Sequence, residues 1–161
     1  MTAAEMALIH KAAFQVPRPW SEGEIADLLA QPLCFVLTEA EGFLIGRVVA
    51  GEAELLTVAV LPDRQGRGIG LRLVQGFLVE AALRGADSAF LEVAEDNLAA
   101  RAVYARAGFG QAGFGQAGFG QAGFGQAGSG QAGRRRGYYG AVDALVMIHG
   151  MVGFTHPTPN P

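Results

Sequence analysis

The stretch of sequence that most narrows the possible folds spans residues 58–74 and reads VAVLPDRQGRGIGLRLV. A run of apolar residues typical of a strand ends at Pro62, and a glycine-rich turn then opens directly into residues with helical spacing. Gly66, Gly68 and Gly70 allow the backbone to come close to a ligand. The N–H groups of a first helical turn have no partner within the helix, so they favour an anion such as a pyrophosphate. Glycines that serve only a tight turn are the alternative interpretation.

Two common nucleotide-binding patterns are excluded for this turn. GRGIG lacks the spacing of the dinucleotide fingerprint, and no Gly-Lys-Ser/Thr is present to make a nucleotide P-loop. Arg64 and Arg67 add positive charge at the same place, which favours an anionic ligand of another kind.

The patterns on either side of the turn predict a mixed α/β (α+β) fold. Ser21 and Glu24 have the spacing of a capping box, so a helix is expected to begin after Ser21. Asn97 and Gly108 have the residue types that begin and end a helix. Hydrophobic spacing predicts further helices over 3–14, 70–85 and 97–108, and strands over 33–39, 43–51, 54–62, 88–95 and 141–151. The first two strands suggest an antiparallel hairpin, and residues 54–93 suggest a strand–helix–strand unit.

Length and composition favour a single globular domain. The chain has 161 residues, of which we expect 1–152 to form the domain and the Pro-rich 153–161 to form a flexible tail. The formal charge of −3 argues against nucleic-acid binding. No run of 18 apolar residues and no signal peptide are present, so a cytoplasmic protein with no membrane span is expected. We expect the protein to be a monomer or a weak dimer. His10, His149 and His156 are scattered, which predicts no metal site.

A carboxylate and a phenol further along the chain have the chemistry of an acid–base pair. Glu92 alternates with the apolar Leu91 and Val93, so it lies on the opposite face of a strand, and Tyr104 lies within the following helix. One could accept a proton from an attacking amine while the other protonates a leaving group. In the structural alternative, Glu92 faces solvent and Tyr104 packs against the sheet.

These motifs occur in an order that resembles a known superfamily. The Gln65-x-x-Gly68-x-Gly70 turn, then LEV, Asn97, Ala-x-x-x-Tyr104 and Gly108-Phe109 resemble the GNAT superfamily of N-acetyltransferases. Within it, PRPWS, ELLTVAV, LEVAEDNLAARAVYARAGF, GRRRGYY and DALVM are similar to the RimI-type protein N-terminal acetyltransferases. The resemblance covers roughly residues 3–149, apart from most of a repeat.

The resemblance implies the GNAT fold, a mixed, mostly antiparallel twisted sheet flanked by helices, and acetyl transfer from acetyl-CoA to a protein N-terminal α-amine. The family's bacterial acceptor is a small-subunit ribosomal protein. Glu92 would match the family's general base, and Tyr104 the general acid that protonates the departing thiolate. The residues implied to bind the pantetheine arm are Thr57, Val58, Ala59 and Val60, those implied to bind the pyrophosphate are Gln65, Gly66, Arg67, Gly68, Ile69 and Gly70, and Asn97 and Tyr104 would also contact the cofactor.

On the acceptor side, Trp20 resembles the family segment that lines the peptide entrance, and Tyr138 and Tyr139 resemble the tyrosines of a late hairpin that hold the substrate backbone. Core packing is the alternative role for Trp20. Two departures from the family are visible: only residues 140–142 separate the paired tyrosines from the Asp-Ala-Leu-Val segment of the last strand, and the usual first strand is missing.

A five-residue repeat follows the helix that contains Tyr104. It reads GFGQA four times and then GSGQA, over residues 108–132. Ordering one copy costs about 5–10 kcal/mol of backbone entropy, whereas burial of its one phenylalanine returns about 1.5–3 kcal/mol. We therefore expect 110–129 to be a low-complexity insertion that protrudes as a mobile loop, with the last copy beginning the next strand.

Three functions remain open on the sequence alone. The first is an N-terminal protein acetyltransferase. The second is an acetyltransferase of a small amine or a lysine side chain, because the same cofactor half serves many acceptors. The third is a non-catalytic CoA-binding module, although the presence of both Glu92 and Tyr104 favours catalysis.

Overall fold

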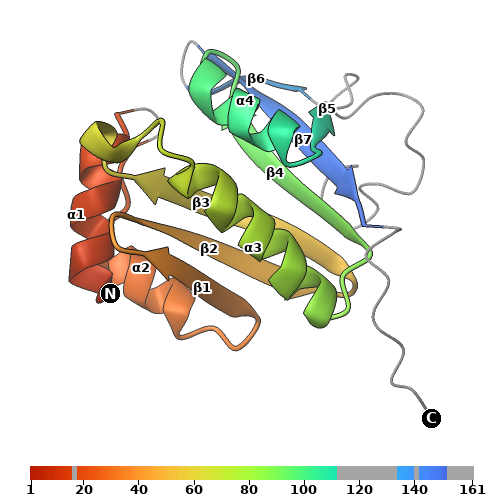
Figure 1. The fold of residues 1–161 in the computed structure, drawn as a ribbon, viewed down its shortest axis with the longest axis horizontal. Coiled ribbons are helices and arrows are strands. Elements are labelled where there is room, and N and C mark those ends of the chain that lie inside the picture. Colours follow the sequence, from red (N-terminus) through yellow and green to blue (C-terminus); the bar gives the residue numbers. More distant parts are fainter. Residues whose placement is uncertain (16–17, 112–133, 140–141, 152–161) are drawn as a thin grey trace.

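The computed structural model describes residues 1–15, 18–111, 134–139 and 142–151, and side chains are described throughout except over 134–142. Each helix and strand predicted from the sequence is present. In chain order the elements are α1 (Ala3–Ala13), α2 (Glu22–Leu29), β1 (Cys34–Glu39), β2 (Gly42–Val49), β3 (Glu52–Val60), the 3-10 helix η1 (Pro62–Arg64), α3 (Ile69–Leu83), β4 (Ser88–Ala94), α4 (Leu98–Arg106), β5 (Gly110–Gln111), β6 (Arg134–Tyr139) and β7 (Val142–Gly150) (Figure 1). The predicted flexible tail lies outside the described residues.

The helix ends are set by local hydrogen bonds. The capping box predicted at Ser21 is present at the start of α2, and Thr2 forms a second one at the start of α1. At α4, Asn97 accepts a hydrogen bond from the Ala100 N–H at 3.2 Å. Gly108, at φ 101°, ends the same helix in a conformation that glycine adopts without strain.

The strands form one sheet in the order β1-β2-β3-β4-β7-β5, with β6 also paired to β7. Of the strand pairs that the structure describes, only β3 and β4 are parallel, which confirms the predicted mixed, mostly antiparallel sheet with a strand–helix–strand unit at its centre. The first described element is α1.

The helices α1 and α2 cover one face of the sheet, and α3 and α4 cover the other (Figure 1). A hydrophobic core lies under each pair of helices. One core packs α3 and α4 against the sheet and contains Leu91, Val93 and Tyr104. The other packs α1 and α2 against the opposite face and contains Met6, Ile9, Ile25, Phe43, Ile45 and Ala59. The two cores share no residue, so a ligand bound on one face of the sheet contacts different residues from a ligand bound on the other face.

The short β5 and the longer β6 lie along the same edge of β7. Gln111 of β5 is opposite Met147, and Arg134 of β6 is opposite Leu145, so only Val146 separates the two pairings. Gly110 and Gln111, which the sequence assigned to the insertion, thus belong to the sheet. The expected loop and the last copy of the repeat lie outside the described residues.

Candidate active site between strands β3 and β4

The centre of the sheet opens where β3 and β4 stop pairing. The two parallel strands are in register from Glu52 opposite Ser88 to Leu55 opposite Leu91, and pair no further. Beyond that point the strands diverge (Figure 1). The segment Thr57–Val60 therefore remains paired with β2 on one edge, while its other edge faces the opening. Unpaired strand edges present backbone donors and acceptors to an extended ligand.

A β-bulge begins at the same place. The register between β2 and β3 shifts between Ile45 and Gly46, which leaves Leu56 as the extra residue in β3. Leu55 and Val58 pack in or against the α3–α4 core, whereas Leu56 packs against the α1–α2 core. Thr57 also points to the α1–α2 face, because its hydroxyl meets α1. The bulge thus interrupts the alternation of side chains and turns Thr57 away from α3.

The glycine-rich turn leads from the end of β3 into α3. Gly66 and Gly68 have φ of 77° and 81°, so the turn uses backbone conformations that glycine adopts easily. The first hydrogen bond of the helix runs from the Arg72 N–H to the Gly68 carbonyl, and no side chain caps this end. The preceding N–H groups therefore lack an intrahelical partner, which is the arrangement of an anion site.

Gln65 has a structural contact within this turn. Its side-chain amide donates to the Val60 carbonyl at 3.1 Å, which ties the turn to the end of β3. Gly70 is the second residue of α3, where a Cβ would lie 3.9 Å from Val103 of α4. That distance is an ordinary van der Waals contact, so this glycine lies against α4 and not in the turn itself.

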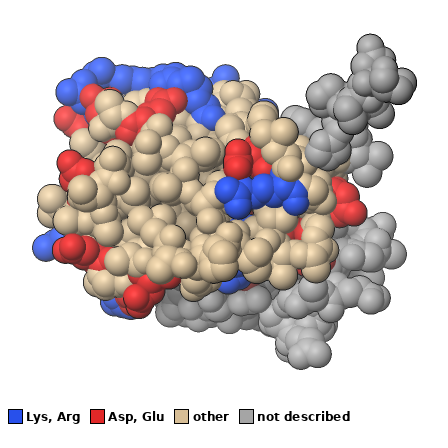
Figure 2. All heavy atoms as spheres, turned by 90° about the horizontal axis from the view of Figure 1, so that it is seen from below, with Lys and Arg blue, Asp and Glu red and all other residues tan. Residues whose placement is uncertain are grey.

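Arginines surround the start of α3. Arg64 lies 3.3 Å from Glu41, and Arg72 is paired with Glu39 at 2.8 Å. Among the described residues, Arg67 has no carboxylate within ion-pair distance, so its charge is available to a ligand. Figure 2 shows Lys and Arg side chains gathered along one edge of the molecule, on the side that carries α3 and α4. This edge attracts anions more strongly than the net charge of the chain suggests.

Glu92 and Tyr104 lie on different faces of the sheet. Glu92 follows Leu91, the last β4 residue paired with β3, and is half-buried. Its neighbours Leu91 and Val93 belong to the α3–α4 core, so alternation directs Glu92 to the α1–α2 face. Tyr104 is 6% exposed within the α3–α4 core, with its ring edge-on to Phe109 at 6.1 Å. The opening between β3 and β4 is where the two faces meet.

The predicted acceptor residues are only partly described. Trp20 is half-buried against the α1–α2 core and stacks on His10 with 5.1 Å between ring centroids. Tyr138 and Tyr139 lie at the end of β6, where Tyr139 pairs with Val142 to close the predicted hairpin with β7, but their side chains are outside the described part.

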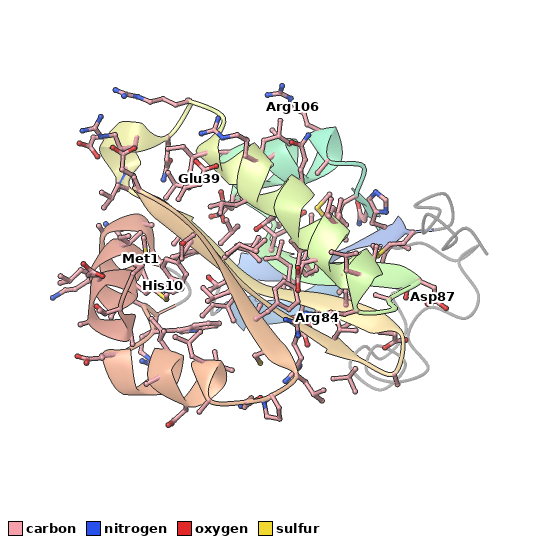
Figure 3. The ribbon with its side chains drawn as sticks, turned by 60° about the horizontal axis from the view of Figure 1, so that its bottom comes forward. Met1, His10, Glu39, Arg84, Asp87 and Arg106 are labelled. Atoms are coloured by element: carbon pink, nitrogen blue, oxygen red, sulfur yellow. The ribbon has the colours of Figure 1, made fainter. Side chains whose placement is uncertain are left out.

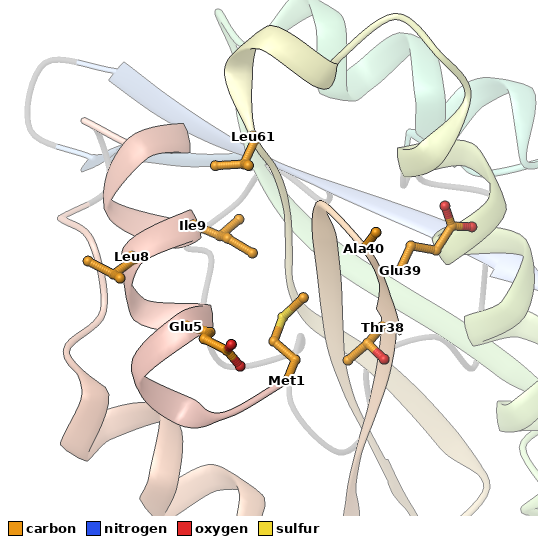
Figure 4. Close-up of a pocket in the computed structure, with 8 residues that line it drawn as sticks. All are labelled: Met1, Glu5, Leu8, Ile9, Thr38, Glu39, Ala40 and Leu61. Carbon is orange, nitrogen blue, oxygen red and sulfur yellow. The ribbon is translucent and has the colours of Figure 1, made fainter.

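A hollow of about 650 Å³ lies between α1 and the β1–β2 turn (Figure 4). It contains none of the residues predicted for the site. Its lining consists of Met1, Glu5, Leu8, Ile9, Thr38, Glu39, Ala40 and Leu61. Within the described ranges no cluster of His, Cys, Asp or Glu could hold a metal, and none of the described helices is long and apolar enough to cross a membrane.

One buried polar residue at the site was not predicted as functional. His10 is 1% exposed, and it contacts both Trp20 and Thr57. Burial lowers the pKa of His10 to about 4, and this effect outweighs the opposing influence of Glu24. The sequence gives no direct signal for these contacts, since the position of a single histidine in a helix does not show which residues it meets in the fold.

Comparison with known proteins identifies the family. The family model "Acetyltransferase (GNAT) family" matches residues 4–109, which is more than half of the chain. The chain therefore belongs to the GNAT acetyltransferase family. Its structure superimposes on the crystal structure of the ribosomal-protein-S18-alanine N-acetyltransferase from Escherichia coli with a TM-score of 0.70 and 28% identity, covering 96% of this chain and 90% of that one. The GNAT fold expected from the sequence is thus confirmed.

Two curated relatives have different acceptors in their names. The chain is 39% identical over 90 residues to the [ribosomal protein bS18]-alanine N-acetyltransferase of Escherichia coli K12, over 53% of this chain and 61% of the relative. It is 37% identical over 93 residues to the mycothiol acetyltransferase of Clavibacter michiganensis, over 52% of this chain and 30% of the relative. The aligned segment thus spans less than two thirds of either relative.

Proposed function

We propose that this protein transfers the acetyl group of acetyl-CoA to the N-terminal α-amine of a protein, with a ribosomal protein as the first candidate acceptor. The observation that carries the proposal is the opening between β3 and β4, which ends beside the uncapped N-terminus of α3. An extended arm that carries a pyrophosphate can use both features at once. The likeness to the bS18-alanine acetyltransferase supports the choice of acceptor.

The cofactor would bind along one continuous surface of backbone groups. The pyrophosphate would lie against residues 65–70, which form the turn and the start of α3, with Arg67 adding charge. The pantetheine arm would pair with the edge of Thr57–Val60 that β4 leaves unpaired. Asn97 caps α4 through its side-chain oxygen, which leaves its amide group to donate to the cofactor. No metal is needed for this chemistry, because the thioester is already activated for attack by an amine.

The reaction would proceed by direct attack. The acceptor nitrogen forms a bond to the thioester carbonyl, its proton passes to Glu92 directly or through water, and the C–S bond breaks as Tyr104 protonates the departing thiolate. An α-amine titrates near 7.7–8.0 and a thiol near 8.5, so a modest base and a weak acid suffice. The two-sided arrangement supports these roles, because Glu92 faces α1 and α2 while Tyr104 lies beside α3.

The acceptor would approach from the α1–α2 face. Trp20 lies on that face, and the hairpin of β6 and β7 carries Tyr138 and Tyr139 at its turn. A peptide N-terminus held between them would reach Glu92 before it reached the cofactor. A small-amine acceptor is the second candidate, because the likeness to the mycothiol acetyltransferase covers a similar length of chain.

Acetyl-CoA turnover with a panel of acceptors tests the proposal. The panel contains peptides with different N-terminal residues, the same peptides with a blocked N-terminus, a lysine peptide and polyamines. Turnover that requires a free peptide N-terminus supports the proposal. Turnover on polyamines or lysine alone would replace it with the second candidate, and CoA binding without any turnover would indicate a non-catalytic module.

A further inference from the structure

His10 connects two parts of the candidate site that are far apart in sequence. It lies in the last turn of α1, on the side that faces the sheet (Figure 3). Its Nδ1 is 3.1 Å from the backbone nitrogen of Trp20, and its Nε2 is 3.0 Å from the hydroxyl oxygen of Thr57. Only 1% of the residue is exposed, so water does not compete for either contact.

The donors and acceptors determine which protons the ring carries. A backbone N–H can only donate, so Nδ1 must accept from Trp20 and remain unprotonated. The proton of the neutral ring is therefore on Nε2, which donates to the Thr57 hydroxyl. A doubly protonated ring would lose the Trp20 hydrogen bond, and burial already disfavours that form. The contacts therefore define one tautomer and one direction for each hydrogen bond.

The partners of His10 belong to the two sides of the reaction. Thr57 is the first residue after the bulge at Leu56, at the start of the β3 segment that faces the opening. Trp20 lies in the connection between α1 and α2, and its ring stacks on the His10 ring. Without the bulge, the Thr57 hydroxyl would point to α3 and out of reach of α1.

We propose that His10 is a positioning residue, which holds the acceptor segment around Trp20 at a fixed distance from the β3 edge that carries the acetyl donor. This inference rests on the proposed function. The histidine does not touch the reacting atoms; it acts by fixing Trp20 relative to Thr57. Its loss should impair use of the acceptor more than use of acetyl-CoA, because β3 is also held in place by its pairing with β2.

Three substitutions at one position separate its contacts. His10→Phe keeps an aromatic ring but removes both hydrogen bonds. His10→Asn places an oxygen near Nδ1 and so keeps an acceptor for Trp20, whereas His10→Gln places a donor near Nε2 and so keeps a partner for Thr57. Lys11→Gln is the matched control, because Lys11 is the adjacent residue of α1 and is exposed.

We expect His10→Phe to raise the KM for the acceptor peptide about tenfold, and to change the KM for acetyl-CoA less than about twofold. The Asn and Gln variants should each recover part of the loss, and the Lys11 control should match the wild type. An acceptor KM within twofold of wild type in the Phe variant, or an equal rise in both KM values, would overturn the proposal.

Hydrogen exchange at one amide separates failure of this inference from failure of the proposed function. The Trp20 N–H should exchange slowly in the wild type and in His10→Asn, and about tenfold faster in His10→Phe at equal global stability. If no peptide is acetylated by the wild type, the proposed function fails, yet this measurement still tests the contact. Slow exchange in the Phe variant would show that His10 does not hold Trp20.

Discussion

Gln111 and Arg134 lie opposite Met147 and Leu145, two residues apart on β7, although residues 112–133 separate them in sequence. The chain leaves the edge of β7 and returns to it almost at the point of departure. β5 and β6 therefore act as two parts of one edge strand, with the repeat inserted between them. This geometry does not depend on the repeat, because the pairing of β5 and β6 with β7 brings Gln111 and Arg134 close together.

Removal of residues 112–131 should preserve the fold. The shortened chain reads GFGQAGRRRGYY, in which only Ala132 and Gly133 would face Val146, and such a two-to-one pairing is the arrangement of a β-bulge. Closing a shorter loop costs less entropy, so we expect the free energy of unfolding to rise by about 1–2 kcal/mol. Urea unfolding of both chains measures this. A loss of more than that amount would show that the repeat stabilises the domain.

Tyr104→Phe should lower turnover while CoA affinity stays nearly intact. The ring is buried beside Phe109, and phenylalanine keeps that packing while it removes the phenol. A weak general acid contributes modestly to the loss of a good leaving group, so we expect kcat to fall about 10- to 100-fold. Steady-state kinetics together with calorimetric CoA binding provide the measurement. Unchanged turnover would remove Tyr104 from the mechanism.

Local signals in the sequence predicted the helices, the strands and the glycine-rich turn. Ser21 and Glu24 predict the start of a helix, because a capping box depends only on residues close together in sequence. Gly66 and Gly68 likewise mark a turn, whose positive φ values the structure confirms. The alternation of Glu92 with Leu91 and Val93 likewise predicts the face of the strand on which Glu92 lies, since strand periodicity is local.

Features that depend on strand register could not be predicted. The bulge at Leu56 arises from the pairing of β2 with β3, and the facing direction of Thr57 follows from it. The contact of His10 with Thr57 then joins residues 47 positions apart, for which sequence spacing carries no signal. The position of β5 and β6 on one edge of β7 is non-local in the same sense.

Gly68→Ala should weaken CoA binding, and Gly85→Ala should not. Both glycines flank α3 with similar φ, 81° and 85°, so alanine costs about 1–2 kcal/mol of backbone strain at either position. Only Gly68 lies at the proposed anion site, where an added Cβ would be 3.2 Å from Arg72. Calorimetric titration with CoA should show weaker binding for Gly68→Ala alone. Equal affinities in the two variants would argue against the anion site at the start of α3.

The free energy of unfolding should decrease as the pH falls below about 6.5, because His10 is buried in its neutral form. Burial lowers its pKa in the folded protein to about 4, whereas the ordinary value of 6.5 applies to the unfolded chain. The unfolded state therefore takes up the proton first as the pH falls, and the contribution of His10 is lost between pH 6.5 and pH 4. A difference of this size corresponds to at most about 3 kcal/mol.

The comparison of wild type with His10→Phe isolates this effect. Other acid-sensitive groups, such as Glu24, whose pKa is lowered to about 2 by its hydrogen bond from Arg18, are present in both proteins. Urea unfolding at pH 7, 5.5 and 4.5 gives the free energy of unfolding of each. We expect the wild type to lose stability faster than the variant as the pH falls, because His10 gains a proton on unfolding and only the wild type has it. Parallel curves would show that the pKa of His10 is not lowered in the folded protein, which would contradict both its burial and its hydrogen bond from the Trp20 N–H.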